Sequence, residues 1–236
     1  MTPRITNRFV ITCEHGGNRV PHAYRKLFKG QARLLKSHRG WDAGALDIAQ
    51  DLAETLNAPL FASTVTRLLV DLNRSIEHSH IYSEATRGAP DSVRRELLTE
   101  HYLPYRNAVE NLIAELIRRE HRVIHISAHS FTPELKGKKR NADVGLLYDP
   151  GRDGEVIFCN HWHKAFKKLT PDLRVRRNYP YTGKADGFTT YLRTCFPPDS
   201  YLGIELEINQ KHVKTGGKAW SALREQVAAA AASVIE

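Results

Sequence analysis

Two histidines follow short apolar runs of the sequence and are suited to hold a metal ion. His15 comes two residues after the run at residues 9–13, and His129 comes two residues after the run at residues 123–127. Neutral imidazole is a common zinc ligand, and a catalytic zinc ion takes three protein ligands and a water molecule. The chain has 12 histidines, so either one alone would be interpreted as a hydrogen-bonded structural residue. The metal interpretation depends on both histidines reaching one edge of a sheet.

Two glutamates alternate with apolar residues in the segment 202–208. Glu205 and Glu207 would share one face of a strand there, and the apolar residues would share the other. In a sheet covered by helices on both faces, a buried carboxylate without a partner is costly. Such a glutamate indicates a metal, a cation or a catalytic role, and a glutamate beside zinc-bound water is a suitable general base.

A third group of polar residues follows the apolar run at residues 68–70. Arg74 offers a planar fork that matches a carboxylate through two hydrogen bonds. Asn73 adds an amide beside it, and Asp71 could orient the arginine. A surface loop with a salt bridge is the alternative interpretation of these residues.

The elements that must position these residues begin with three amphipathic helices, in which apolar residues recur at three- and four-residue steps. One follows Asp42, which is a suitable N-cap. A second begins at Pro104, a favourable residue for a first turn, and a third covers residues 220–234.

Short runs with strand character lie between the helices. They are residues 9–13, 60–63, 68–72, 123–127, 144–148 and 202–208. Strands that alternate with helices indicate an α/β fold, a three-layer sandwich around a mixed or mostly parallel central sheet. No linker divides the chain, so residues 1–236 are expected to form one domain. Ligands of such sheets bind beyond the carboxyl ends of the strands, where the residues above are expected to gather.

The composition of the 236-residue chain is typical of a folded protein, with 41% hydrophobic and 26% charged residues. Its 3 cysteines are too few for a disulfide framework. No segment reaches the ~18 apolar residues of a membrane span, and residues 1–8 lack the apolar core of a signal peptide. We therefore expect a soluble cytoplasmic protein with reduced thiols and no membrane partner.

The formal net charge of +9 suits either a nucleic acid or a small anionic substrate. The densest basic cluster, at residues 136–140, is interpreted as a solvated loop. The sequence has no aromatic RNA-binding pattern and no helix-turn-helix signal. A basic nucleic-acid-binding domain, with structural histidines and glutamates, is therefore the less favoured alternative.

Four motifs occur in order along nearly the whole chain and together resemble a known family. They are EHGG at residues 14–17, DLNR at 71–74, AHSF at 128–131 and ELEINQ at 205–210. This combination resembles the N-formylglutamate amidohydrolase family, which is distantly similar to the zinc carboxypeptidases and aspartoacylases. The resemblance implies a zinc-carboxypeptidase-like fold.

The resemblance also implies a zinc site, in which His15 and His129 are ligands. In the related carboxypeptidases and aspartoacylases the first histidine belongs to a His-x-x-Glu motif, but here the fourth position is Asn18. Asp42 is the implied third ligand, because the family has an acidic residue near this Trp-Asp step. Glu14 and Asn18 are the alternatives.

The resemblance further implies which residues bind the substrate. The pair Asn73 and Arg74 is similar to the clamp that holds the substrate carboxylate in the aspartoacylases. Arg140 and Asn178 would bind the other end of the substrate, although Arg140 could also hold the amino-acid carboxylate.

Glu207 is implied as the general base, with Glu205 on the same strand face as the alternative. The implied reaction is hydrolysis of the amide bond of a small anionic N-acyl amino acid, such as N-formylglutamate, by zinc-activated water. A peptidase-like amidase that acts on a larger amide is a second enzyme interpretation.

Overall fold

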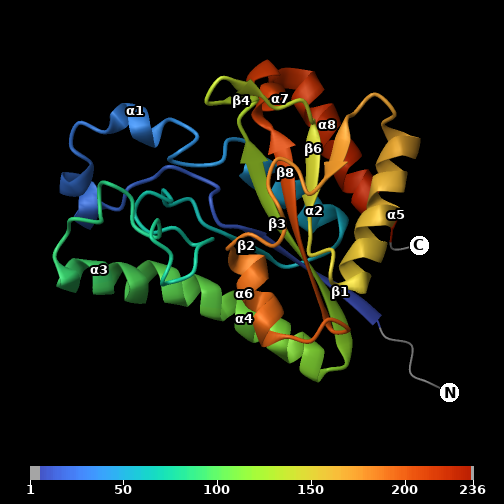
Figure 1. Cartoon of the computed structure of the whole chain (residues 1–236), viewed down its shortest axis with the longest axis horizontal. Coiled ribbons are helices and arrows are strands. Elements are labelled where there is room, and N and C mark those ends of the chain that lie inside the picture. Colours follow the sequence, from blue (N-terminus) through green and yellow to red (C-terminus); the bar gives the residue numbers. More distant parts are fainter. Residues whose placement is uncertain (1–5, 235–236) are drawn as a thin grey trace.

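The computed structural model describes residues 6–234, and its centre is a six-stranded sheet with the strand order β2-β1-β3-β8-β6-β7 (Figure 1). The strands are β1 (Thr6–Cys13), β2 (Leu60–Ala62), β3 (His121–Phe131), β6 (Val144–Leu147), β7 (Val175–Arg177) and β8 (Tyr201–Asn209). Strands β1, β2, β3 and β8 are parallel, whereas β6 pairs antiparallel with β8 and parallel with β7. The predicted mixed, mostly parallel sheet is confirmed.

Helices cover both faces of this sheet (Figure 1). One face is covered by α2 (Ala45–Thr55), α5 (Asp153–Leu169) and α8 (Gly217–Ala232), and the other by α4 (Leu103–Arg118) and α6 (Phe188–Cys195). The first face buries a large apolar cluster that includes Ile48, Trp162 and Trp220. The second face buries a smaller cluster that includes Val109 and Leu192. The structure therefore has the predicted three layers.

The alternation of side chains along β3 and β8 decides which of them can form a site. Ile126 and Leu206 belong to the cluster beneath α2, α5 and α8. Because successive side chains of a strand point to opposite faces, His129 and Glu207 point towards the layer of α4 and α6. The two residues are direct neighbours in the register of β3 and β8. The strand pairing thus places a histidine and a glutamate side by side on one face.

Shorter elements surround the sheet. They are η1 (His22–Phe28), α1 (Ala32–Leu35), α3 (Asp91–Leu97), the π-helical η2 (Leu98–Tyr102), the hairpin strands β4 (Glu134–Leu135) and β5 (Lys138–Lys139), and α7 (Gln210–Thr215). Among the described residues, no helix is both long and apolar enough to cross a membrane.

The strand predicted at residues 68–72 is wrong. This run forms turns, and its apolar side chains join a separate cluster with Phe28, Ile81 and Leu97. Four of its five residues are buried apolar side chains, so the run lacks the alternation of a half-exposed strand. It is fixed by a hydrogen bond from the Asp71 N–H to the carbonyl of Ile81, at 2.9 Å.

The predicted helices are confirmed, but the N-cap of the first is wrong. The N-cap of α2 is Gly44, at a positive φ of 79°, and no side chain caps this helix. The carboxylate of Asp42 is turned towards His15 and His129 instead. Helix α4 begins at Leu103, one residue before Pro104, and continues the helical stretch of α3 and η2.

Candidate active site

The loop after β1 brings His15 next to His129 of β3. The two imidazole rings have centroids 5.0 Å apart. A Cβ on Gly17 would lie 2.5 Å from the carbonyl oxygen of Thr64, so glycine is needed where this loop packs against the segment after β2. His129 lies inside β3, which continues to Phe131, and not beyond the strand end as the sequence suggested.

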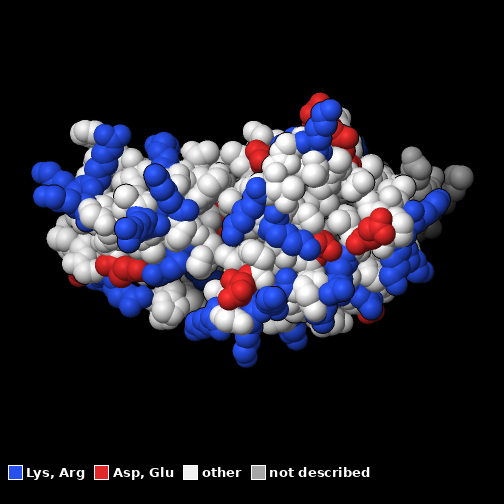
Figure 2. All heavy atoms as spheres, turned by 90° about the horizontal axis from the view of Figure 1, so that it is seen from above, with Lys and Arg blue, Asp and Glu red and all other residues white. Residues whose placement is uncertain are grey.

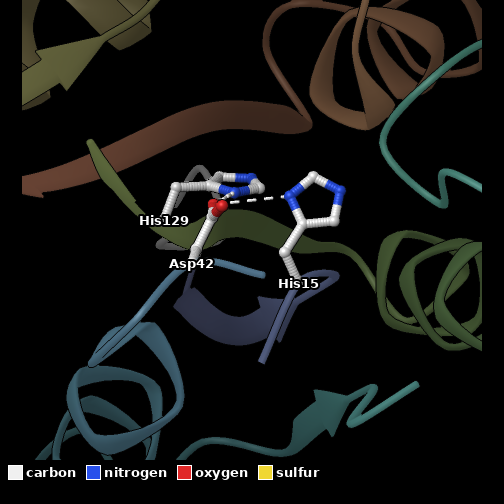
Figure 3. A group of neighbouring side chains, drawn as sticks. All are labelled: His15, Asp42 and His129. Carbon is white, nitrogen blue, oxygen red and sulfur yellow. Dashed lines mark hydrogen bonds and ion pairs between the residues drawn. The ribbon is translucent and has the colours of Figure 1, made fainter. Parts of the chain in front are cut away.

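Asp42 completes a buried group of three possible metal ligands (Figure 3). Its Oδ2 lies 3.4 Å from Nδ1 of His15 and 2.9 Å from Nδ1 of His129. One ligand atom from each of the three residues lies within 4.8 Å of the others. The backbone N–H of Asp42 also donates to the carbonyl of His15, at 3.0 Å, which ties the two loops together.

The outward nitrogen of each histidine is held by a carboxylate, directly or through a hydroxyl. Nε2 of His15 lies 2.7 Å from Asp71, whose other oxygen accepts two hydrogen bonds from Arg67. Nε2 of His129 lies 2.9 Å from the hydroxyl of Ser127, which donates to Glu14 at 2.7 Å. These contacts favour the tautomers in which both Nδ1 lone pairs face Asp42, the arrangement typical of metal-binding histidines.

The Nδ1 lone pairs of the two histidines and the carboxylate of Asp42 converge in a buried space. Such a group of acceptors is stable only if a proton or a cation lies between them. Burial alone lowers the pKa of His129, but its hydrogen bonds to Asp42 and Glu14 raise this pKa well above its usual value. Burial likewise opposes ionisation of Asp42, yet the two histidines and Arg67 hold the pKa of its carboxyl well below the usual range. The residues therefore fit a divalent cation, and zinc is commonly bound by such nitrogen and oxygen donors.

Glu207 lies beside this group, and its carboxylate makes no hydrogen bond or ion pair with residues 6–234. It pairs with His129 across the β3–β8 register and is 6% exposed. Its Oε2 is buried and has no hydrogen-bond partner among residues 6–234. Burial raises the pKa of Glu207 to about 8, although His129 partly opposes this shift. Glu205 is less buried and accepts a hydrogen bond from the Thr189 hydroxyl at 3.2 Å.

A pocket of about 310 Å³ opens over these residues. All but one of the predicted site residues line it: His15, Asp42, Asn73, Arg74, His129, Arg140, Glu205 and Glu207. The exception is Asn178, whose side-chain oxygen accepts hydrogen bonds from the N–H groups of Tyr148 and Gly183. Asn178 therefore orders the chain after β7, where its own φ of 48° is positive, and is not placed at the pocket.

The alternatives to Asp42 as third ligand lie elsewhere. Glu14 contacts His129 from the far side of the ring, at Nε2 and 3.3 Å. The amide of Asn18 donates to the carbonyl of Leu35 at 3.1 Å. Of the three candidates, Asp42 is the one that contacts both histidines.

Three arginines line the pocket, and one of them, Arg67, is paired with Asp71. The other two, Arg74 and Arg140, differ in how far their guanidinium groups are paired within the protein. One guanidinium nitrogen of Arg74 donates to the carbonyl of Asp186 and lies 3.9 Å from its carboxylate. The guanidinium of Arg140 lies over the rings of Tyr181 and Phe131, at 4.9 and 5.9 Å, and has no carboxylate partner among residues 6–234. On the face at the carboxyl ends of β3 and β8, Lys and Arg side chains cover more of the surface than Asp and Glu side chains do (Figure 2).

Asn73 is engaged within the protein. Its Oδ1 accepts a hydrogen bond of 2.6 Å from the N–H of Phe188, at the start of α6. Its Nδ2 lies 3.3 Å from Nε2 of His129. The Oδ1 contact therefore links the DLNR segment to α6. The Nδ2 contact places the amide next to the candidate metal site, but it is not a hydrogen bond in the tautomer above, because both nitrogens then carry hydrogen.

Two supporting residues were not identified from the sequence. Ser127 and Arg67 were missed, although the spacing of Arg67 and Asp71 is that of a local ion pair, which the structure contains at 2.7 Å. Ser127 lies two residues before His129, on the same face of β3. That period of two was the available signal for its role.

A comparison with protein-family models matches residues 7–213 to the model described as N-formylglutamate amidohydrolase. The chain belongs to the N-formylglutamate amidohydrolase family. It is therefore a hydrolase that acts on amide bonds, and the resemblance inferred from its motifs is confirmed. This assignment excludes the alternative in which the protein is only a nucleic-acid-binding domain.

Solved structures resemble this family member over most of its length. A gene product of Agrobacterium tumefaciens has 29% identity and a TM-score of 0.78, over 97% of this chain and 92% of that chain. An N-formylglutamate amidohydrolase from Ralstonia eutropha has 16% identity and a TM-score of 0.71, over 99% and 94%. A metallo-carboxypeptidase from Burkholderia cenocepacia is more distant, with 13% identity and a TM-score of 0.39, over 99% and 57%. No curated protein matches the sequence.

Gly145, near the site, allows the backbone of β6 to lie close to the segment after β7. A side chain at this position would prevent that approach. A Cβ on Gly145 would lie 2.0 Å from the carbonyl oxygen of Tyr179 and 3.2 Å from Cβ of Glu207. We expect Gly145→Ala to displace the segment after β7 and to lower the free energy of unfolding by about 1–3 kcal/mol, as overpacking does. Urea denaturation measures this change.

The matched control is Gly88→Ala. A Cβ there would meet no atom within 4 Å, and Gly88 is not at a positive φ. Equal stabilities of the Gly145→Ala protein and the Gly88→Ala protein would show that the close approach at Gly145 is not required.

Proposed function

We propose that this protein hydrolyses the amide bond of a small N-acyl amino acid, such as N-formylglutamate, with a zinc ion held by His15, Asp42 and His129. The observation that carries the proposal is the convergence of these three buried side chains beside Glu207. The family assignment supports the type of bond that is cleaved. The pocket of about 310 Å³ favours a small substrate over a peptide.

The chain's own residues would act as follows. Bound zinc would supply a Lewis acid that lowers the pKa of water and polarises the acyl carbonyl. Glu207 would accept a proton from water at its unpartnered Oε2 and return it to the departing nitrogen. This proton transfer converts a poor leaving group into a neutral amine.

The arginines of the pocket would orient the substrate. Arg74 would bind the amino-acid carboxylate with the donors that Asp186 leaves free. Arg140, which has no carboxylate partner among residues 6–234, would bind a second carboxylate. Holding both ends of the substrate fixes the scissile amide next to Glu207, which reduces the entropic part of the barrier.

Metal removal tests this proposal. Protein purified without chelator is expected to contain about one zinc ion per chain, and a chelator is expected to abolish hydrolysis of N-formylglutamate. Added zinc should restore it, because the three ligands are the proposed source of affinity. Metal analysis and an assay of released formate measure both effects.

A substrate panel separates this proposal from a peptidase-like amidase. Formyl- and acetyl-amino acids should be cleaved and dipeptides should not. Full activity in the chelated, metal-free protein would contradict the metal-dependent mechanism, and preference for dipeptides would contradict the substrate class.

A further inference from the structure

Arg106 of α4 is a buried arginine outside the pocket. It is 4% exposed and has no carboxylate partner among the described residues. One of its terminal nitrogens donates to the carbonyls of Leu72 and Arg74, at 3.1 and 3.3 Å. Burying a guanidinium without a counter-ion is costly. What this arginine provides is therefore a set of hydrogen bonds to the DLNR segment that an apolar residue could not make.

Aromatic rings hold the guanidinium of Arg106 in place. Its carbon lies 4.9 Å from the ring centroid of Tyr102, 4.3 Å from that of Phe188 and 4.5 Å from that of Tyr191. The ring faces stabilise the buried charge. Because Phe188 and Tyr191 belong to α6, Arg106 joins three parts of the fold: α4, α6 and the DLNR segment.

Tyr102 supports the same backbone group. Its hydroxyl donates to the carbonyl of Arg74 at 2.7 Å. Tyr102 ends the π-helical η2 and lies four residues before Arg106, so both side chains project from one side of the helical stretch. Short π-helical segments are rare and frequently occur at functional sites. Here Tyr102, at the end of this segment, and Arg106, in the first turn of α4, both donate to the carbonyl of Arg74.

The other side of the DLNR segment is held by the chain before α6. The N–H of Ser75 donates to the carboxylate of Asp186 at 3.1 Å, and Asn73 accepts the N–H of Phe188 at 2.6 Å. The main chain around Arg74 is therefore fixed from both sides. Its side chain reaches into the pocket from a backbone that has little freedom to move.

We propose that Arg106 is a positioning residue which, together with Tyr102, fixes the main chain at Arg74 and so sets where Arg74 meets the substrate carboxylate. This inference rests on the proposed function, in which Arg74 binds that carboxylate. Arg106 does not line the pocket and acts through the carbonyl of Arg74 and through the rings of α6.

The test measures binding and catalysis in the full chain. The Kd of L-glutamate is measured by calorimetry, and KM and kcat are measured with N-formylglutamate. Arg106→Met keeps an apolar stem among the rings but removes the donors. It is expected to raise Kd and KM on the order of 10- to 100-fold, as a small misplacement of a binding group can, while kcat changes less. Arg106→Lys, which retains the charge, should recover part of the loss.

Tyr102→Phe is the milder companion variant. It removes one hydroxyl and keeps the ring, so it should fold and should raise Kd and KM in the same direction by a smaller factor. Adding Arg106→Met to Arg74→Ala should weaken binding no further than Arg74→Ala alone, because Arg106 acts through Arg74. Full additivity of the two changes would overturn the inference.

Arg152→Met is the matched control for stability. Arg152 also donates to backbone carbonyls, those of Tyr201, Arg193 and Phe196, but at the amino end of β8. It is expected to lower the thermal midpoint without changing Kd. An Arg106→Met protein that, like this control, loses stability but keeps its Kd and KM would show a purely structural role.

The outcomes separate this inference from the proposed function. If Arg74→Ala weakens binding while Arg106→Met and Tyr102→Phe do not, the positioning role is wrong and the clamp stands. If Arg74→Ala leaves Kd and KM unchanged, or the unaltered protein does not bind L-glutamate, the proposed clamp is wrong and this inference fails with it.

Discussion

Replacement of Glu207 by glutamine is expected to lower kcat by roughly 10²- to 10⁴-fold, the contribution typical of general acid–base catalysis. Glutamine has nearly the same shape but cannot accept the proton that the buried Oε2 is proposed to take. The metal content should stay near that of the unaltered protein, because Glu207 is not one of the three proposed ligands. Steady-state kinetics and metal analysis of the same preparation measure both quantities.

Glu205→Gln is the comparison that assigns the base. Glu205 shares the strand face with Glu207, but one of its oxygens is engaged by the hydroxyl of Thr189. Its replacement should lower kcat less than Glu207→Gln does. A larger loss in Glu205→Gln would reverse the assignment, and loss of the metal in Glu207→Gln would make Glu207 a ligand.

Replacement of Asp42 by asparagine is expected to weaken zinc binding by more than about 100-fold, beyond the 10- to 100-fold typical of an outer-shell partner. Oδ2 of Asp42 is the atom that lies near both histidines, so the change removes the central charge of the site. Activity at low zinc concentration should be lost in parallel. Competition with a chromophoric chelator measures the affinity.

The two alternative ligands provide matched controls for Asp42. Glu14→Gln alters a group that contacts the outward nitrogen of His129, so it should weaken zinc binding by about 10- to 100-fold. Asn18→Ala should leave the affinity unchanged, since the Asn18 amide is bonded to the carbonyl of Leu35. If Asn18→Ala weakened zinc binding as much as Asp42→Asn, the third ligand would have to be reassigned.

The sequence determined those features that depend on local periodicity. The alternation of Glu205 and Glu207 with apolar residues predicted their common face, because side chains along any strand alternate. The helix after Asp42, the helix near Pro104 and the C-terminal helix followed from their apolar spacing. The family could also be predicted from the sequence, since its motifs are short and occur in order along the chain.

The tertiary structure decided which polar groups meet. Asp42 resembles an N-cap in local sequence, and only the family resemblance implied that it is a ligand. Its approach to His129, 87 residues away, is decided by the packing of distant segments. The run at residues 68–72 has strand-like composition but is drawn into a separate apolar cluster, where no sheet edge is available to it. Asn178 satisfies nearby backbone groups and does not reach the pocket.

Arg106 illustrates the same limit most clearly. An arginine on an amphipathic helix is normally predicted to be exposed to solvent. Nothing in the sequence around Arg106 predicts that its side chain is buried. Its environment is made by α6 and by the DLNR segment, which are distant from Arg106 in the sequence. Local sequence fixes the direction of each side chain relative to its own element, whereas the partners of that side chain depend on how distant elements pack.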